Sequence, residues 1–316
     1  MNCEPHLPFG VGAVFFWALA WRTFEDMKRL RFGLGLGAVA LWLATGCDVV
    51  EDPIVPNTTA YQEELYGPAP AFTPIAAEQH VLVEDFTAHQ CGNCPAAAII
   101  AEAMQASNPE KIAVMAIHAG SLAATDDDHF DTDWTTEEGD VFWNQLSFQA
   151  NPLGRINRVG GPGNFFAPAQ WEDQANAILA ANDTPLGLEV VTEWVPEADH
   201  LNIHVHGSFV QATDGPISLA VLFLESGIID YQLDYASDPE VVEDYEFNHV
   251  LRGSVTGALG LGFGAAASGA SAGDEIVTSY TYTWPAEWVI ENATVLAVVS
   301  GPDGEIINVA ETHPVQ

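Results

Sequence analysis

Basic residues are scarce in this chain of 316 residues, where 8 Lys and Arg stand against 44 Asp and Glu, for a net charge of −36. Lysine occurs only at Lys28 and Lys111. So acidic a chain repels phosphate backbones, which argues against nucleic acid as a partner. Apolar residues make up 48% of the chain, so it can bury a core, and global disorder is excluded. The excess of acid favours a protein kept soluble at high salt over a surface that collects divalent cations.

Cysteine is also scarce, and four cysteines are too few for the disulfide framework of a small secreted domain. Cys91 and Cys94 form a C-x-x-C pair, Cys47 ends an apolar segment, and Cys3 lies near the start. No second pair with the spacing of zinc ligands follows the first pair. We therefore expect no metal and no cofactor.

The N-terminal part has the features of an export signal. Residues 27–46 begin with a basic stretch, continue with an apolar one and end on small residues before Cys47, as a secretory signal does. Residues 43–47 resemble a bacterial lipobox, in which the cysteine becomes the first mature residue and carries lipid. The alternative is a short buried helix or a single membrane anchor. Residues 1–26 are interpreted as a doubtful extension, with translation starting at Met27. Residues 47–75 contain five prolines and are predicted to be a tether.

The C-x-x-C pair lies between a predicted strand and a predicted helix. Residues 81–87 are β-rich and apolar, and residues 96–104 are strong helix formers. A helix start lowers the pKa of a cysteine thiol through its free N–H groups and its dipole. We therefore expect Cys91 to be an exposed, reactive thiol at the helix start, with Cys94 buried one turn further on. A structural zinc site is the alternative.

The elements that follow alternate between strand and helix. Residues 111–118 and 151–157 are predicted strands, and residues 137–148 and 167–182 are predicted helices. This order predicts an α/β domain with a mixed sheet over residues 76–183.

Residues 76–183 resemble a thioredoxin-fold domain with an insertion. Asp85 lies six residues before Cys91, where many thioredoxins carry a buried acid. Pro152 lies where that family places a cis-proline facing the redox pair. The resemblance implies that Cys91 attacks a substrate disulfide, that Cys94 resolves the mixed disulfide, and that Pro152 shapes the substrate groove.

Over residues 76–316 the chain is more closely similar to the outer-membrane protein 28-related family of Bacteroidetes-type bacteria. The similarity is carried by residues 84–87, 91–95, 152–158 and 248–252. It implies an outer-membrane lipoprotein that is anchored through Cys47 and faces the periplasm or the cell surface. Its partner would be a protein thiol or disulfide.

Three further side chains near the pair, Asp85, His89 and His118, are candidates for tuning its chemistry. Asp85 could relay protons to Cys94, and burial would raise the pKa of its carboxyl group. Glu84 competes with it for the inward position, which would leave Asp85 in solvent. His89 and His118 could tune the thiols, or they could be an exposed loop histidine and a hydrogen-bonded histidine at the core edge.

Two other groups of polar residues are judged not to bind metal. Residues 126–133 offer several carboxylates to Ca²⁺ but lack the spacing of an EF-hand, so a solvated acidic loop is favoured. His204 and His206 alternate on one face of a predicted strand, where exposure to solvent is the favoured interpretation.

Residues 184–316 are predicted to form an all-β, sandwich-like domain. Strand-like runs cover residues 186–195, 201–212, 217–226, 246–252, 275–284, 293–300 and 305–311. Short strands separated by turns are typical of a β-sandwich. Residues 253–273 are rich in glycine without charge and are predicted to be a flexible loop. No catalytic set of residues is visible in this part, which suggests a binding or spacing role.

The sequence thus predicts an α/β thioredoxin-like domain followed by an all-β sandwich-like domain, with Cys91 and Cys94 exchanging disulfides. The competing hypothesis is a surface binding protein in which the Cys91–Cys94 pair is a static disulfide.

Overall fold

The computed structural model describes residues 59–315 of the chain. The expectations for residues 1–26, for the signal at 27–46 and for Cys47 lie outside the described residues. Within residues 59–315, no helix is both long enough and apolar enough to cross a membrane.

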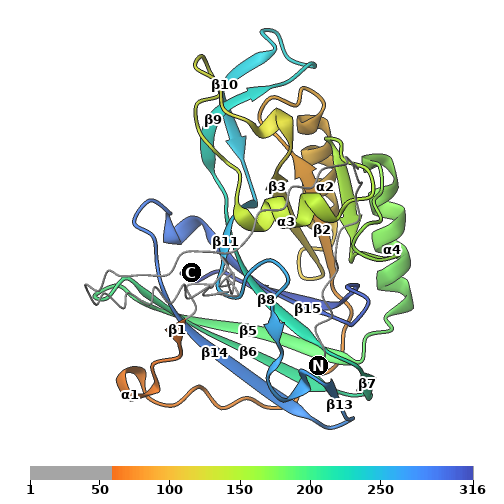
Figure 1. Ribbon diagram of the computed structural model, residues 1–316, viewed down its shortest axis with the longest axis vertical. Helices are drawn as coiled ribbons and strands as arrows, with labels where there is room; N and C mark the ends of the chain where they lie inside the picture. Colours follow the sequence, from red (N-terminus) through yellow and green to blue (C-terminus); the bar gives the residue numbers. More distant parts are fainter. Residues whose placement is uncertain (1–58, 316) are drawn as a thin grey trace, which may run out of the picture. The chain divides into compact units, whose positions relative to one another are not determined.

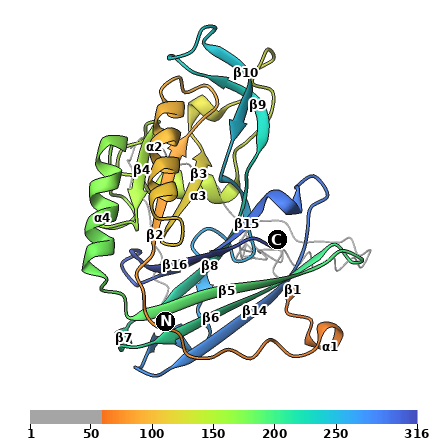
Figure 2. The same ribbon diagram turned by 180° about the vertical axis from the view of Figure 1, so that it is seen from behind.

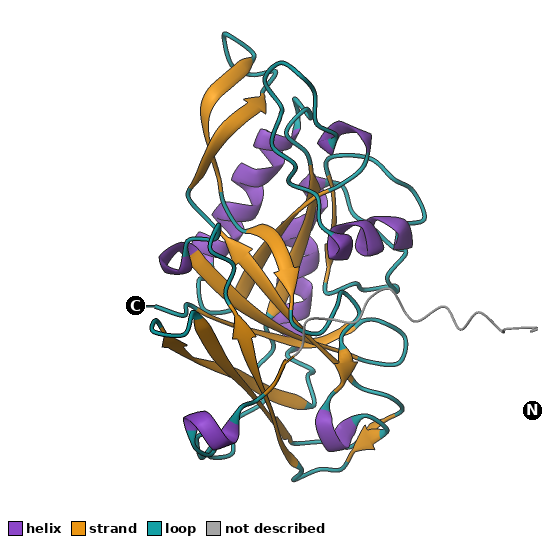
Figure 3. Ribbon diagram, turned by 60° about the vertical axis from the view of Figure 1, so that its left-hand side comes forward, coloured by secondary structure: helices purple, strands orange, loops and turns teal. Residues whose placement is uncertain are grey.

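The described chain has a β-rich fold with a few helices (Figures 1 and 3). The α-helices are α1 (Glu63–Tyr66), α2 (Cys94–Ser107), α3 (Glu137–Gln145) and α4 (Trp171–Ala181). The short 3-10 helices are η1 (Ser121–Ala123), η2 (Pro168–Gln170), η3 (Gly264–Ala266) and η4 (Ile290–Asn292). The strands are β1 (Thr59–Ala60), β2 (Val81–Thr87), β3 (Ile112–His118), β4 (Leu153–Ile156), β5 (Leu186–Val195), β6 (His200–Phe209), β7 (Thr213–Asp214), β8 (Ser218–Glu225), β9 (Ile228–Leu233), β10 (Val241–Phe247), β11 (Val250–Ser254), β12 (Leu261–Gly262), β13 (Gly269–Ala270), β14 (Glu275–Thr283), β15 (Ala293–Ser300) and β16 (Ile306–Thr312).

One mixed sheet of eight strands runs through the described chain in the order β16-β15-β8-β11-β3-β2-β4, with β12 beside β8. Strands β2 and β3 are parallel and are connected by α2, and β4 is antiparallel to β2. Strand β11 joins β3 in parallel and β8 in an antiparallel pair. Figure 2 shows β2, β3 and β4 on the same side of β8 as α2 and α4. Strands from both sides of residue 183, the predicted domain boundary, therefore share one sheet.

Strand β2 is buried along its whole length, as expected for a central strand covered on both faces. Because side chains alternate along a strand, Val81 and Val83 face one cluster, which includes Trp171 of α4. Leu82 and Phe86 face another cluster on the opposite side of the sheet. The two faces of β2 thus offer two separate buried environments to the carboxyl groups at residues 84 and 85.

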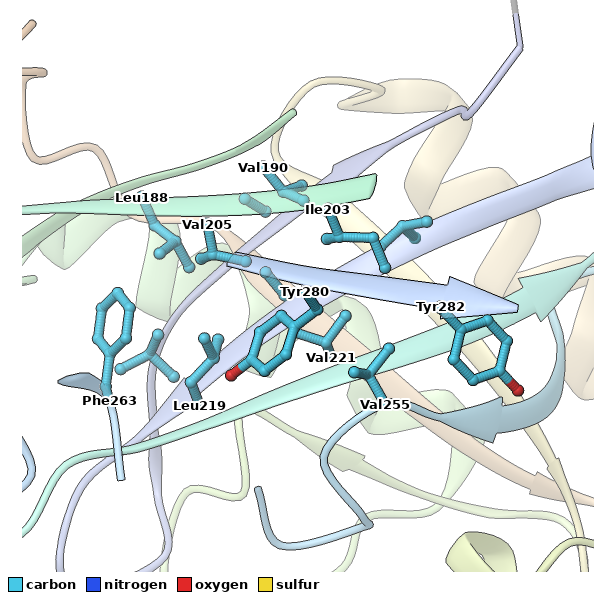
Figure 4. Packing of buried hydrophobic residues seen from close by; sticks show 14 of the residues in the cluster. Leu188, Val190, Ile203, Val205, Leu219, Val221, Val255, Phe263, Tyr280 and Tyr282 are labelled. Atoms are coloured by element: carbon cyan, nitrogen blue, oxygen red, sulfur yellow. The ribbon is translucent and has the colours of Figure 1, made fainter. Parts of the chain in front are cut away.

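A second sheet, in the order β1-β14-β6-β5, packs on the β8–β15 part of the first sheet. Figure 4 shows Val205 and Ile203 of this sheet gathered with Leu219 and Val221 of β8. This packing of two sheets fits the sandwich-like expectation for the second half of the chain. Phe263, fully buried in the same cluster, lies in the segment predicted to be a flexible loop. That prediction is wrong, because residues 253–273 form short strand pairs and bury apolar side chains.

Residues 60–76, mostly within the predicted tether, pack along the outer face of the second sheet. Tyr66 Oη lies 2.6 Å from His200 Nδ1, and the ring of Phe72 stacks on His206 with centroids 4.7 Å apart. His204 and His206 are consequently buried, so the expectation that they face solvent is wrong. The aromatic residues among the prolines supply the apolar surface that holds this segment down.

The four basic residues after Cys47 leave almost no positive charge on the described surface. Arg155 and Arg158 are buried, and Arg252 forms a largely buried ion pair. Lys111 keeps a side chain that is 45% exposed. The many carboxylates at the surface therefore repel one another with little compensation.

We predict that the melting temperature of the protein rises as NaCl goes from about 0.1 M to about 1 M, since the Debye length falls from ~10 Å to ~3 Å. Circular dichroism at near-neutral pH checks this. The same titration near pH 4, where many surface carboxylates are protonated, is the control and should show a smaller rise. A melting temperature that is flat or falling at neutral pH would contradict the interpretation.

Candidate functional site

Cys91 and Cys94 are joined by a disulfide, with their Cα atoms 5.3 Å apart. Helix α2 begins at Cys94, with Asn93 at its cap and Pro95 in its first turn, where no N–H partner is needed. Cys91 lies in the turn between β2 and α2, and its carbonyl accepts the N–H of Cys94 at 3.0 Å. The prediction that the helix begins near Cys91 is therefore wrong by one turn.

Both cysteines are buried, with 3% of Cys91 and 1% of Cys94 exposed. The expectation of an exposed Cys91 is therefore wrong. The two cysteines cluster with Ala88 and Ala123, and the second half of the chain adds a hairpin of β9 and β10 that leaves the sheet after β8 (Figure 1). The sequence gives no hint of this contact, because the hairpin lies more than a hundred residues after the cysteines.

The hairpin contacts the cysteine turn through its main chain and one buried side chain. Leu233 N donates to the carbonyl of residue 89 at 2.8 Å, and Tyr235 N donates to the carbonyl of residue 92 at 2.9 Å. Gln232 Nε2 donates to the Cys91 carbonyl at 3.2 Å and is itself buried. These residues belong to the site although the sequence analysis did not identify them.

The base of the hairpin is closed by residues 248–252, one of the segments that carry the family resemblance. Asn248 Oδ1 accepts the main-chain N–H of Gly227 at 3.0 Å. His249 adopts a positive φ of 58°, and Arg252 pairs with Glu225 at 2.8 Å. This segment therefore fixes the place where the hairpin leaves and re-enters the sheet.

Asp85 lies on the face of β2 that is turned toward α2, and it is 2% exposed. Its Oδ1 has no hydrogen-bond partner among the described residues. Burial raises the pKa of Asp85 to about 8. The alternative in which Asp85 lies in solvent is wrong.

A small cavity lies between Asp85 and Cys94. The cavity has a volume of about 30 Å³, and Asp85, Cys94, His118 and Gln232 all line it. A space of this size between polar groups holds a water molecule. Cys94 rather than Cys91 is thus the cysteine that shares a polar space with the buried carboxyl group.

Glu84 is buried on the opposite face of β2, so the two neighbouring carboxyl groups do not compete for one position. Glu84 contacts Arg155 Nε at 2.7 Å and Arg158 Nη2 at 2.8 Å. Both guanidinium groups also lie over the ring of Phe142. Burial alone would raise the pKa of Glu84, but the two arginines hold it below the usual value.

His118 ends β3 beside Thr87 and is buried. Neither of its ring nitrogens has a hydrogen-bond partner within residues 59–315, and burial, with a smaller effect of His89, lowers its pKa to about 3. His89 is also buried, with Nε2 3.0 Å from the Ala124 carbonyl. The expectations of an exposed His89 and a hydrogen-bonded His118 are both wrong.

Pro152 follows a cis peptide bond with Asn151. Asn151 Nδ2 donates to the carbonyl of Thr87 at 2.9 Å, which places this turn at the end of β2. The cysteine turn leaves β2 from the same end.

The acidic loop at residues 126–133 uses one carboxylate to organise its own backbone. Asp126 Oδ1 accepts the main-chain N–H groups of residues 128, 129 and 130. These hydrogen bonds lower the pKa of Asp126. No group of three or more metal-ligating side chains converges in the part of the chain that the structure describes.

Comparison with known proteins places the chain among outer membrane proteins. The family model described as outer membrane protein Omp28 matches residues 140–316, which include the hairpin but not the cysteine pair. No curated protein matches the chain. HBP35 of Porphyromonas gingivalis is similar in structure, with a TM-score of 0.57 at 17% identity over 75% of this chain and 76% of that chain. A protein from Agrobacterium tumefaciens gives a TM-score of 0.46 at 13% identity over 76% and 97% of the two chains. At such identities the likeness to HBP35 concerns the fold alone.

Proposed function

Since this chain belongs to the Omp28 family of outer membrane proteins, we propose that its Cys91–Cys94 pair carries out thiol–disulfide exchange on protein partners. Cys91 lies in the turn after β2, Cys94 begins α2, and α2 leads to the parallel strand β3, as in a thioredoxin-like domain. The observation that carries the proposal is the cavity shared by Asp85 and Cys94.

The exchange uses the two cysteines in different roles. The thiolate of Cys91 attacks a partner disulfide, forms a mixed disulfide and releases one partner thiolate. Cys94 then loses its proton, through the cavity, to the ionised form of Asp85, whose raised pKa of about 8 is close to that of an ordinary thiol, and attacks the Cys91 sulfur. The Cys91–Cys94 disulfide forms, the second partner thiol leaves, and two electrons have passed to the partner. Pro152, beside the cysteine turn, would shape the groove for the partner.

The protein would act in the cell envelope as a lipoprotein. The proposed anchor is lipid on Cys47, and the folded part would face the periplasm or the cell surface. Four basic residues after Cys47 leave a strongly acidic surface, so the proposed partners are proteins without dense negative charge around their disulfide.

Trapping tests this role directly. We expect the Cys94→Ser protein to accumulate mixed disulfides through Cys91 in cells, because the resolving thiol is absent. Mass spectrometry of acid-quenched, alkylated protein identifies the attached partners. The matched control is Cys91→Ser, which should trap none. Equal trapping by both variants, or by neither, would contradict the assigned roles.

A static disulfide is the second candidate, and the burial of both cysteines favours it. The reduction potential of the pair separates the two functions. A value below about −300 mV is typical of a structural disulfide, and a higher value is typical of an exchanging pair.

A further inference from the structure

The β9–β10 hairpin contacts the rest of the fold through the cysteine turn and through aromatic side chains. Within the described chain, β9 and β10 pair with each other and with no other strand. A two-stranded hairpin is marginally stable alone in water. Its position therefore depends on contacts with other parts of the fold, which are those with residues 88–92, the packing of Phe247 on His118 and Trp134, and the stacking of Tyr231 on His129.

The contacts with the cysteine turn resemble those of an added strand on the donor side only, because the accepting carbonyls of residues 89 and 92 lie three residues apart in a turn. The main-chain N–H groups of Leu233 and Tyr235, two residues apart, donate to the carbonyls of residues 89 and 92. Alternate N–H groups of an extended segment point to the same side, which is how a bound peptide pairs with a free edge. The hairpin thus fills the edge of the cysteine turn that a partner's extended segment would use.

The side chain of Tyr235 completes the cover. Its ring lies so close over Gly92 that a Cβ at residue 92 would be 2.5 Å from the Cδ1 atom of the ring. Glycine is therefore required at this position while the hairpin is in place. The other side of the ring faces solvent, since Tyr235 is 58% exposed.

We propose that the β9–β10 hairpin is a lid that occupies the docking edge for an extended polypeptide segment of the partner, and that exchange requires its release. The proposal rests on the proposed exchange function. A nucleophile must approach a sulfur along the line of the S–S bond, and both cysteines are buried, packed against Ala88 and Ala123 with the hairpin bound to their turn. The hairpin thus competes with the partner's extended segment for the same edge of the cysteine turn.

The rate of reduction by a phosphine measures how fast the lid opens. This rate does not depend on the reduction potential of the cysteine pair. Tris(2-carboxyethyl)phosphine attacks a sulfur and breaks the S–S bond, and water then converts the phosphonium into phosphine oxide, which leaves two thiols. The full chain is mixed with increasing phosphine at high salt, and samples are quenched by alkylation. Mass spectrometry then follows the peptide that contains Cys91 and Cys94. We expect the rate to reach a plateau set by opening of the lid.

Matched variants on one hairpin make the test specific. We expect Gln232→Ala and Tyr235→Ala each to raise the plateau about tenfold, because each removes a contact that holds the lid closed. Ile229→Ala, at an exposed position of β9, is the control and should leave the rate unchanged. Gly92→Ala should also speed reduction by displacing the ring, but should add nothing in the Tyr235→Ala background. Circular dichroism verifies that each variant is folded.

The outcomes separate the lid from the proposed function. A rate that is linear in phosphine and equal in all variants would overturn the lid. Acceleration in the lid variants combined with a structural reduction potential would support the lid and overturn the exchange function. Faster reduction in the lid variants, together with more trapped partner protein in Tyr235→Ala, would support both the lid and the exchange function.

Discussion

Glu84→Gln is expected to lower the free energy of unfolding by about 3–5 kcal/mol, because it leaves two buried guanidinium groups without their carboxylate. Arg155 and Arg158 are 0% and 4% exposed and share Glu84 as their anionic partner. Their remaining hydrogen bonds do not supply a negative charge. Urea unfolding at near-neutral pH, followed by circular dichroism, measures the loss.

The matched control is Glu78→Gln, the same substitution in an exposed ion pair. Glu78 lies 3.6 Å from Lys111, with side chains that are 61% and 45% exposed. Solvent screens such a pair, so we expect a loss below about 1 kcal/mol. Equal losses of unfolding free energy in the two variants would show that the buried ion pair contributes no more to stability than the exposed one.

The pH dependence of this loss has a definite sign. Arg155 and Arg158 outweigh the effect of burial and hold the pKa of Glu84 below its usual value. The stability from this depressed pKa is present above the unfolded pKa and is lost as the pH falls through the folded pKa. The difference between wild type and Glu84→Gln should therefore narrow in acid.

Strands with continuous apolar runs are predictable from the sequence alone. Strand β2 lies at the predicted residues 81–87 and β15 at the predicted residues 293–300, and both are buried along nearly their whole length. Burial on both faces gives such strands a strong local signal. The pairing of β3 with β11 has no such signal, because it joins segments far apart in the chain.

The lid over the cysteine pair could not be predicted for a different physical reason. Residues 228–247 carry seven acidic residues and no basic one, a composition typical of a solvated surface segment. The contacts with the cysteine turn are made largely by main-chain N–H groups, which any sequence offers. The exposure of Cys91 was therefore mispredicted, although the strand before it was placed well.

The two neighbouring carboxyl groups on β2 show the limit of reasoning from alternation. The pattern places Glu84 and Asp85 on opposite faces, which suggests that one of them faces solvent. Both are buried, because Arg155 and Arg158, about seventy residues later, neutralise Glu84. Asp85 has no cation beside it among residues 59–315 and is buried with an oxygen that has no partner there.

Asp85→Asn is accordingly expected to have the opposite effect from Glu84→Gln, and to raise the free energy of unfolding near neutral pH. Burial raises the pKa of Asp85 to about 8 in the folded protein, against about 3.9 in an unfolded chain. Between pH about 3.9 and pH about 8, ionisation of Asp85 lowers the free energy of the unfolded state but not that of the folded state. Each pH unit above about 3.9 thus costs about 1.4 kcal/mol of stability, until the folded group ionises near its own pKa. Asparagine avoids this cost, so we expect a gain of roughly 3–4 kcal/mol at about pH 7.

The pH profile distinguishes ionisation from packing as the cause of the gain. Urea unfolding of wild type and Asp85→Asn should give equal stability near pH 4, with a difference that grows as the pH rises. Glu102, Glu246 and His249 also line the cavity, but they are present in both proteins and cancel in the difference. The matched control is Asp127→Asn in the exposed acidic loop, where we expect a change within about 0.5 kcal/mol. A gain that is the same at every pH would show that the pKa of Asp85 is not raised in the folded protein, and the closeness of its pKa to that of a thiol, on which its role as the proton acceptor for Cys94 rests, would be lost.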